Sequence, residues 1–147
     1  MYTKYRIIAA GELGRWPPLI IGVGVDSIEI ARVADSIQRS PRLRQRLFTG
    51  RELAQLPPGA KGPSRLAALF AAKEAVFKAL GTGLAGHSWL QVEIIHNQHG
   101  APEIYLKDKA AETAACLGIS KVHISLSHDR DRAVAFCIAE GENRCNG

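Results

Sequence analysis

The sequence has little cysteine and no long hydrophobic run. Its three cysteines, Cys116, Cys137 and Cys145, form no CxxC pair, which argues against both a disulfide framework and a zinc site. We expect Cys116 and Cys137 to be small apolar core residues. The longest apolar run near the start, from Leu19 to Val25, is far too short to cross a bilayer. Because the N-terminal part also lacks a secretory signal pattern, the sequence predicts a cytoplasmic protein without a membrane span.

Aromatic residues make up only 6% of the chain, whereas basic residues are in excess. The length of 147 residues, with 46% hydrophobic and 22% charged residues, is typical of one folded globular domain. The formal net charge of +5 and the pI near 9.4 favour an anionic partner. Charge alone does not distinguish phosphate, nucleic acid or an acidic protein.

The chain divides into three parts by composition. We expect an N-terminal extension over residues 1–18, one domain over residues 19–140 and a C-terminal tail over residues 141–147. The extension mixes aromatics, glycines and prolines without periodicity. Its basic residues leave organelle targeting open as an alternative to the cytoplasm.

The first half of the domain predicts one strand followed by helices. An apolar run over 19–26 predicts the strand, and helical spacing predicts a helix over 28–40. Asp26 is expected in the tight turn between them. Pro41 starts a short helix with Leu43 and Leu47 inward, and a capping box at 49–52 opens another. Ser64 is expected to cap a long helix that Gly81 ends.

The second half predicts mainly strands. A hairpin is expected at 90–95 and 103–106 around a turn at 97–100, then a helix over 108–117. Two further strands, 122–127 and 133–139, are joined at 128–131. The fold class is therefore α+β, an antiparallel sheet with packed helices.

Two carboxylates stand out as a candidate metal site. Asp26 follows the first strand and Glu74 lies on the long helix, and two such acids completed by phosphate and water oxygens suit Mg²⁺. The alternatives are structural: Asp26 as a helix cap, and Glu74 as the i,i+4 partner of Lys78.

Residues downstream of Glu74 have the chemistry of a phosphate site. Lys78 shares a helix face with Glu74, and the turn Gly81-Thr82-Gly83 permits close backbone approach to a ligand. The residues alone favour the structural alternative, a helix that ends in an ordinary glycine C-cap. His128 at a strand end can contact phosphate or relay a proton, or be merely structural.

Four segments in this order resemble one family. They are Gly22-Val-Gly-Val-Asp-Ser-Ile-Glu-Ile30, Phe70-Ala-Ala-Lys-Glu-Ala75, Lys78-Ala-Leu-Gly-Thr-Gly83 and Ser127-His128. Together they are similar to the holo-[acyl-carrier-protein] synthase family, which has the 4'-phosphopantetheinyl transferase fold. The resemblance runs from about Leu19 to Glu140.

The resemblance implies a function, a site and partners. The family moves the 4'-phosphopantetheine group of coenzyme A onto a serine of apo acyl carrier protein, releasing 3',5'-ADP, in fatty-acid or polyketide biosynthesis. It implies Mg²⁺ ligands at Asp26 and Glu74, a phosphate-binding and catalytic Lys78, and coenzyme A contacts at Gly81, Thr82, Gly83 and His128. It further implies carrier contacts at Arg32, Arg39 and Arg42, and a homotrimer with active sites where subunits meet.

Two questions stay open at the level of the sequence. The serine proton goes to a metal-bound water, to Glu29 or to His128. Leu69 stands where many members have arginine, with Arg65 one helical turn earlier, which leaves a nucleotide contact in doubt. Leu69 keeps open a catalytically impaired relative that binds carrier protein. The basic pI and the arginine run over 39–51 keep open a nucleic-acid-binding module, which the lack of interleaved aromatics disfavours.

Overall fold

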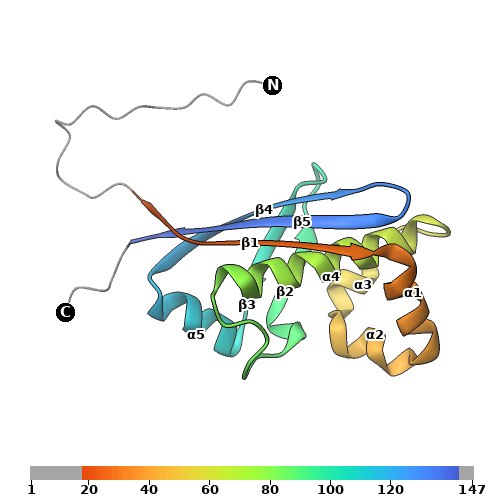
Figure 1. Ribbon diagram of the computed structural model, residues 1–147, viewed down its shortest axis with the longest axis horizontal. Coiled ribbons are helices and arrows are strands. Elements are labelled where there is room, and N and C mark those ends of the chain that lie inside the picture. Colours follow the sequence, from red (N-terminus) through yellow and green to blue (C-terminus); the bar gives the residue numbers. More distant parts are fainter. Residues whose placement is uncertain (1–17, 143–147) are drawn as a thin grey trace.

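A computed structural model of the chain describes residues 18–142 (Figure 1). The expected extension and tail therefore lie almost wholly outside the described residues. The elements follow in the order β1 (Leu19–Glu29), α1 (Ile30–Arg39), α2 (Pro41–Leu47), α3 (Gly50–Ala54), α4 (Lys61–Ala79), the 3-10 helix η1 (Trp89–Gln91), β2 (Val92–His96), β3 (Pro102–Leu106), α5 (Asp108–Cys116), β4 (Ile119–His128) and β5 (Arg132–Gly141).

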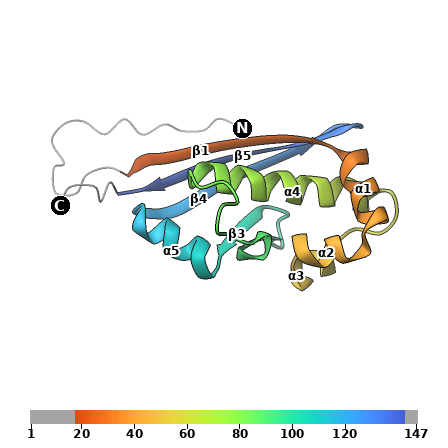
Figure 2. The ribbon, with the colours of Figure 1, turned by 60° about the horizontal axis from the view of Figure 1, so that its bottom comes forward.

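The strands form two antiparallel sheets. The larger has the order β1-β5-β4 and the smaller is the hairpin β2-β3. Figure 2 shows α4 along one face of the larger sheet, with α2, α3, α5 and the hairpin on the far side of α4. The predicted α+β class is confirmed, although the sheet is divided in two.

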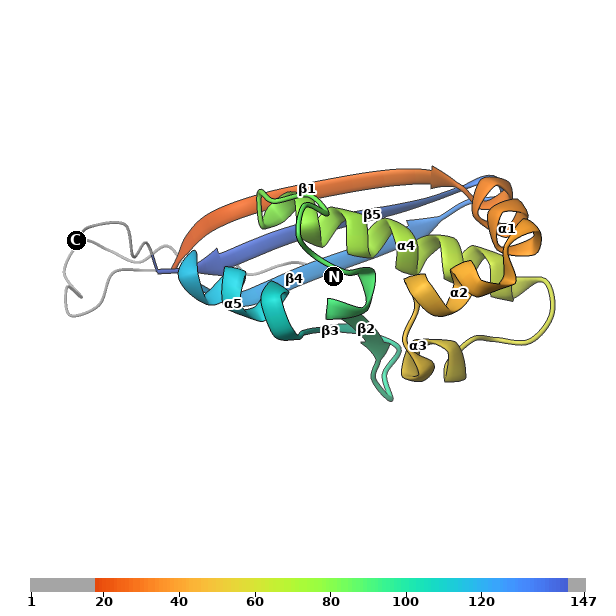
Figure 3. The same cartoon turned by 90° about the horizontal axis from the view of Figure 1, so that it is seen from below.

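Helix α4 forms the centre of the core because it is apolar on nearly every side. Its small residues Ala67, Ala71 and Ala75 are completely buried, as is Phe77. A helix that is buried all round packs against elements on both sides, and Figure 3 shows α4 between the large sheet and the smaller elements. The position of α4 thus fixes where its few charged residues point.

Two glycines of β1 allow α4 to lie directly against the strand. A Cβ on Gly22 would come 2.0 Å from the carbonyl oxygen of Ala79, and one on Gly24 would come 1.9 Å from that of Ala75. Alternate residues of a strand face opposite sides, so Asp26 shares the helix-facing side with these glycines. Val23 and Val25 face the other way and are more than half exposed.

Strand β1 is longer than the sequence predicted. It pairs with β5 as far as Glu29 opposite Arg132, and α1 begins only at Ile30. The prediction that Asp26 lies in a turn is therefore wrong, because continued pairing with β5 keeps it within the strand. The N-cap of α1 is Glu29, which makes no side-chain capping bond. Asp26 is thus not the cap of this helix.

Two further predictions are corrected by the structure. Helix α4 begins at Lys61 rather than after Ser64, whose hydroxyl donates to the Lys61 carbonyl. Pro63 lies in the first turn, where its missing N–H is not needed. Cys116 is exposed near the end of α5, whereas Cys137 is buried as predicted.

Several local predictions are confirmed. Thr49 and Glu52 form the reciprocal capping box at the start of α3. Leu47 is buried and Leu43 packs against the core. The hairpin turn at 97–100 closes through the bond from Asn97 N to the Ala101 carbonyl. Within residues 18–142, no helix is long and apolar enough to cross a membrane.

Candidate functional site

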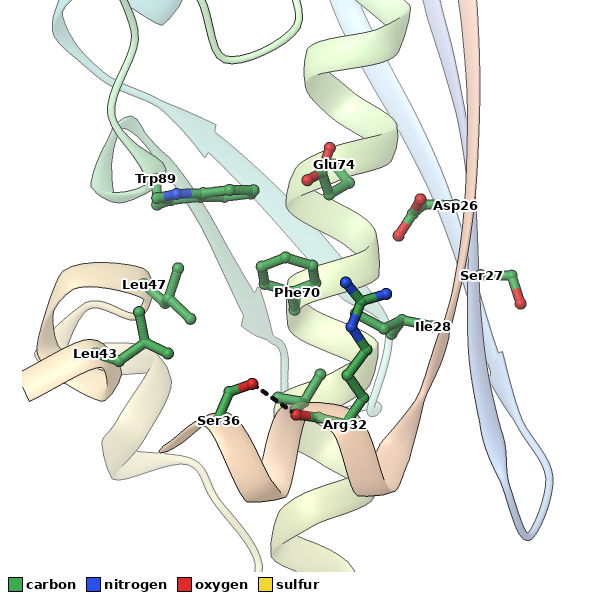
Figure 4. Close-up of a pocket in the computed structure, with 11 residues that line it drawn as sticks. Asp26, Ser27, Ile28, Arg32, Ser36, Leu43, Leu47, Phe70, Glu74 and Trp89 are labelled. Atoms are coloured by element: carbon green, nitrogen blue, oxygen red, sulfur yellow. Dashed lines mark hydrogen bonds between the residues drawn. The ribbon is translucent and has the colours of Figure 1, made fainter. Parts of the chain in front are cut away.

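A pocket of about 470 Å³ opens between β1, α1, α2, α4 and η1. Its polar side contains Asp26, Glu74 and Arg32, and its apolar side is formed mainly by Leu43, Leu47, Phe70 and Trp89. Figure 4 shows the side chains of Asp26 and Glu74 on the same side of the pocket, Asp26 directed toward α4 and Glu74 toward the Trp89 side, with the Arg32 guanidinium directed toward the same space. The structure therefore brings together three of the predicted site residues.

The local fold explains this placement. Asp26 follows the two glycines on the inner side of β1, so its short side chain reaches toward α4. Glu74 extends from the middle of α4 and is half-buried. Arg32 comes from the first turn of α1, and the Ser36 hydroxyl donates to its backbone carbonyl at 2.8 Å (Figure 4).

Lys78 contacts Asp26 across the strand–helix interface. Its ammonium lies 3.0 Å from Asp26 Oδ1 and donates to the Val25 carbonyl at 2.9 Å. The structural alternative, in which Lys78 is the i,i+4 partner of Glu74, is therefore replaced by an ion pair between α4 and β1. Lys78 remains half exposed, with 49% of its side chain accessible. Its ammonium is thus available to a ligand at the pocket edge.

Asp26 and Glu74 place two negative charges in one pocket, and Lys78 and Arg32 offset them in part. Burial raises the pKa of Glu74, and the negative charge of Asp26 raises it further, while Lys78 opposes the shift. A divalent cation between the two would relieve this repulsion. Among the described residues, no group of three or more His, Cys, Asp or Glu side chains could hold a metal. The site fits a cation that takes most of its ligands from phosphate and water, as Mg²⁺ does.

The remaining predicted residues lie outside this pocket. Gly81 and Gly83 have positive φ angles in the loop after α4, consistent with the expected turn. Arg39 and Arg42 are exposed where α1 meets α2. Glu29, an alternative proton acceptor, lies 3.4 Å from Arg132 and lines a different pocket.

His128 lines a separate basic pocket of about 430 Å³ with Lys61, Ser64 and Arg65. One chain therefore does not bring His128 to the carboxylates. Leu69 is 2% exposed and belongs to the core, whereas Arg65 lies in this second pocket. Arg65 and Lys61, both on α4, are thus the basic residues that line this second pocket with His128.

Sequence reasoning missed two features of the site. One is Trp89, which stacks on Phe70 with ring centroids 4.9 Å apart and forms a pocket wall. The other is the pair of Lys73 and Glu52, whose charged atoms lie 2.9 Å apart with no exposed side-chain surface. The available signal was spacing: Phe70, Lys73 and Phe77 share one helix face, and a lysine among apolar residues indicates a buried partner.

Comparisons with known proteins agree with the geometry. A family model described as the 4'-phosphopantetheinyl transferase superfamily matches residues 22–137. The holo-[acyl-carrier-protein] synthase of Alkaliphilus metalliredigens is 41% identical over 121 residues, which cover 82% of this chain and 99% of that protein.

Solved structures give the same result. The holo-[acyl-carrier-protein] synthase of Neisseria meningitidis has a TM-score of 0.75 and 32% identity, covering 82% of this chain and 98% of that one. The Bacillus anthracis enzyme, in complex with coenzyme A (3',5'-ADP), has a TM-score of 0.69 and 30% identity, covering 84% and 98%. The chain therefore belongs to the holo-[acyl-carrier-protein] synthase family of the 4'-phosphopantetheinyl transferase superfamily.

Proposed function

We propose that the pocket between Asp26 and Glu74 is the place where this chain carries out the family's reaction. The chain is a holo-[acyl-carrier-protein] synthase, which transfers the 4'-phosphopantetheine group from coenzyme A to acyl carrier protein. The observation that carries the location is that Asp26 and Glu74 line one pocket, with Lys78 next to Asp26. The cytoplasmic location expected from the sequence stays a prediction.

Asp26 and Glu74 would hold Mg²⁺ in this pocket. Support comes from the raised pKa of Glu74, caused by its burial and by the charge of Asp26, and from the small number of protein ligands. When bound, the ion would offset negative charge that develops on the pyrophosphate of coenzyme A. Phosphoryl transfer depends mainly on positioning and charge neutralisation.

Lys78 and the loop from Gly81 to Gly83 would bind the phosphates from the helix side. The ammonium of Lys78 is already fixed next to Asp26 by the Val25 carbonyl. When a pyrophosphate oxygen approaches, this ammonium can share its three donors among Asp26, Val25 and the ligand. The catalytic contribution of Lys78 is then electrostatic and does not require it to lose a proton.

A homotrimer would explain the separate basic pocket at His128. In such an assembly, the pocket of Lys61, Arg65 and His128 on one subunit meets the carboxylates of another, and together they bind coenzyme A. Val23, Val25, Val134 and Phe136 form an exposed apolar face of the large sheet, each at least 37% accessible, and a second and third copy are its proposed occupants. A monomeric wild-type protein with full activity would overturn this proposal.

The carrier protein would bind beside the pocket. Arg32 enters the pocket from α1, and Arg39 and Arg42 are exposed at the junction of α1 and α2. An acidic surface is attracted to such a group, and the attraction is screened by salt. Carrier binding would also account for the excess of basic residues, which was the main support for a nucleic-acid-binding module.

The test is the intact mass of a purified apo acyl carrier protein after incubation with this protein, coenzyme A and MgCl₂. One phosphopantetheine adds roughly 340 Da, as expected for this transfer. EDTA is expected to abolish the gain. If several apo carriers show no gain, the impaired-relative hypothesis replaces the catalytic one.

A further inference from the structure

A buried ionic cluster lies behind the pocket wall, on the side away from the reaction. Lys73, Glu52 and Glu93 are each at most 1% exposed. Removing charges from water is costly unless they are paired and hydrogen-bonded. In the structure, each of these three charged side chains has an oppositely charged partner within 3.0 Å.

The two carboxylates bond to different partners. Glu52 receives the Ile94 N–H at 2.9 Å, the Thr49 N–H at 2.8 Å and the Lys73 ammonium at 2.9 Å. Glu93 pairs with two exposed cations, Arg51 at 2.8 Å and Lys107 at 3.0 Å. Lys73 is therefore the cation of this cluster that lies inside the core.

Lys73 has one further contact that leads to the pocket. Its ammonium donates to the backbone carbonyl of Trp89 at 3.0 Å. Above this bond, the indole of Trp89 packs on Phe70 at 4.9 Å and edge-on against Phe77 at 6.0 Å. One face of α4 thus holds Trp89 by its backbone and by its ring.

Trp89 in turn forms the wall that faces the carboxylates (Figure 4). It lines the pocket with Phe70 and Leu47, while Glu74, the neighbour of Lys73 in sequence, projects into the same pocket. Leu43 and Leu47, which line the pocket with Trp89, belong to α2, the helix that contacts η1 and carries the proposed carrier contact Arg42. From these contacts we propose that Lys73 is a positioning residue, which fixes Trp89 as the wall next to α2 and so shapes the carrier-binding side of the pocket. This inference rests on the proposed function.

The experiment uses the full chain with Trp16→Phe, which leaves Trp89 as its sole tryptophan because the sequence contains two. Lys73→Met with Glu52→Gln then replaces the buried ion pair with neutral side chains of similar length. This double substitution avoids leaving one charge buried without its partner. Lys107→Met is the matched control, because it removes a cation from the same cluster but does not touch Trp89.

We expect the double variant to fold, to show red-shifted Trp89 emission and stronger acrylamide quenching, and to raise KM for the carrier about ten-fold with a smaller change in kcat. Asp26, Glu74 and Lys78 keep their own contacts, which is why kcat changes less. The control is expected to match the parent in fluorescence and KM.

Unchanged Trp89 fluorescence or unchanged KM in the double variant would overturn the proposal, as would equal changes in the Lys107→Met control. If the double variant does not fold, Lys73→Leu with Glu52→Gln in the same background, which also leaves no unpaired buried charge, provides the fluorescence readout. Absence of transfer by the parent protein is a different result, because it refutes the proposed function while the fluorescence still reports on Trp89.

Discussion

Lys73 and Glu74 are neighbours on α4, yet they lie in opposite electrostatic surroundings. Lys73 is inside the core, where Glu52 and the Trp89 carbonyl satisfy its ammonium. Glu74 faces a pocket in which burial, and then the charge of the nearby acid Asp26, raise its pKa. The comparison teaches that saturation by protein partners separates a structural charge from one that awaits a ligand. Each region should therefore respond differently to substitution.

The largest expected effect is on the pocket. Glu74→Gln or Asp26→Asn should lower kcat/KM about a thousand-fold, which corresponds to about 4 kcal/mol of transition-state stabilisation. The free energy of unfolding should change little, because neither carboxylate is buried in a saturated network. Single-turnover transfer and urea unfolding of the same preparations check both parts. A variant that keeps near-normal turnover would show that the pair is not the metal site.

For the buried cluster of Lys73, Glu52 and Glu93, we expect a large loss of stability with little loss of kcat. Glu52→Ala leaves Lys73 in the core without its carboxylate and should cost roughly 3–5 kcal/mol of stability. The fraction that remains folded should keep most of its kcat, because Glu52 does not line the pocket. Urea unfolding with an activity assay below the transition measures this. Large loss of kcat without loss of stability would contradict the comparison.

A close backbone contact between β1 and α4 at Gly24 holds Asp26 near the helix that carries Lys73 and Glu74. Gly24→Ala places a methyl group against the Ala75 carbonyl, which should cost about 1–3 kcal/mol and move Asp26 away from α4. Gly50→Ala is the matched control, since nothing lies within 4 Å of its added Cβ. The control should be as stable as the parent or up to about 1 kcal/mol more stable. Thermal unfolding and transfer activity distinguish the two variants.

The smallest effect concerns pH. Burial and the charge of Asp26 raise the pKa of Glu74, so its contribution to stability is fully present below the unfolded pKa and is lost as pH rises through the folded one. Glu74→Gln abolishes this loss. Metal-free Glu74→Gln should therefore gain Tm relative to the parent near neutral pH, and the gain should shrink in acid. A gain in Tm that is largest in acid would contradict a raised pKa of Glu74.

Local chemistry in the sequence predicted much of the fold. The capping box at Thr49 and the hairpin turn at Asn97 depend on neighbouring residues, and both are confirmed. The extent of β1 was missed because its end depends on pairing with β5, more than a hundred residues away. The start of α4 was missed because a proline is harmless within a first turn.

The site was only partly predictable for the same reason. Asp26 and Glu74 were predicted to meet, and the structure places them at one pocket. The pairing of Lys78 with Asp26 and the wall formed by Trp89 arise from close packing of α4, which no local pattern encodes. The separation of His128 from the carboxylates could not be predicted, because sequence motifs do not say whether a site lies within one chain.

The most direct measurement of the central claim is a titration with Mn²⁺ as an EPR-visible substitute for Mg²⁺, carried out with coenzyme A on the parent protein, Asp26→Asn, Glu74→Gln and Glu29→Gln. We predict saturable binding to the parent and to Glu29→Gln, and strongly weakened binding to the other two. Equal Mn²⁺ binding by all four proteins would contradict the assignment of the carboxylate pair as the metal site.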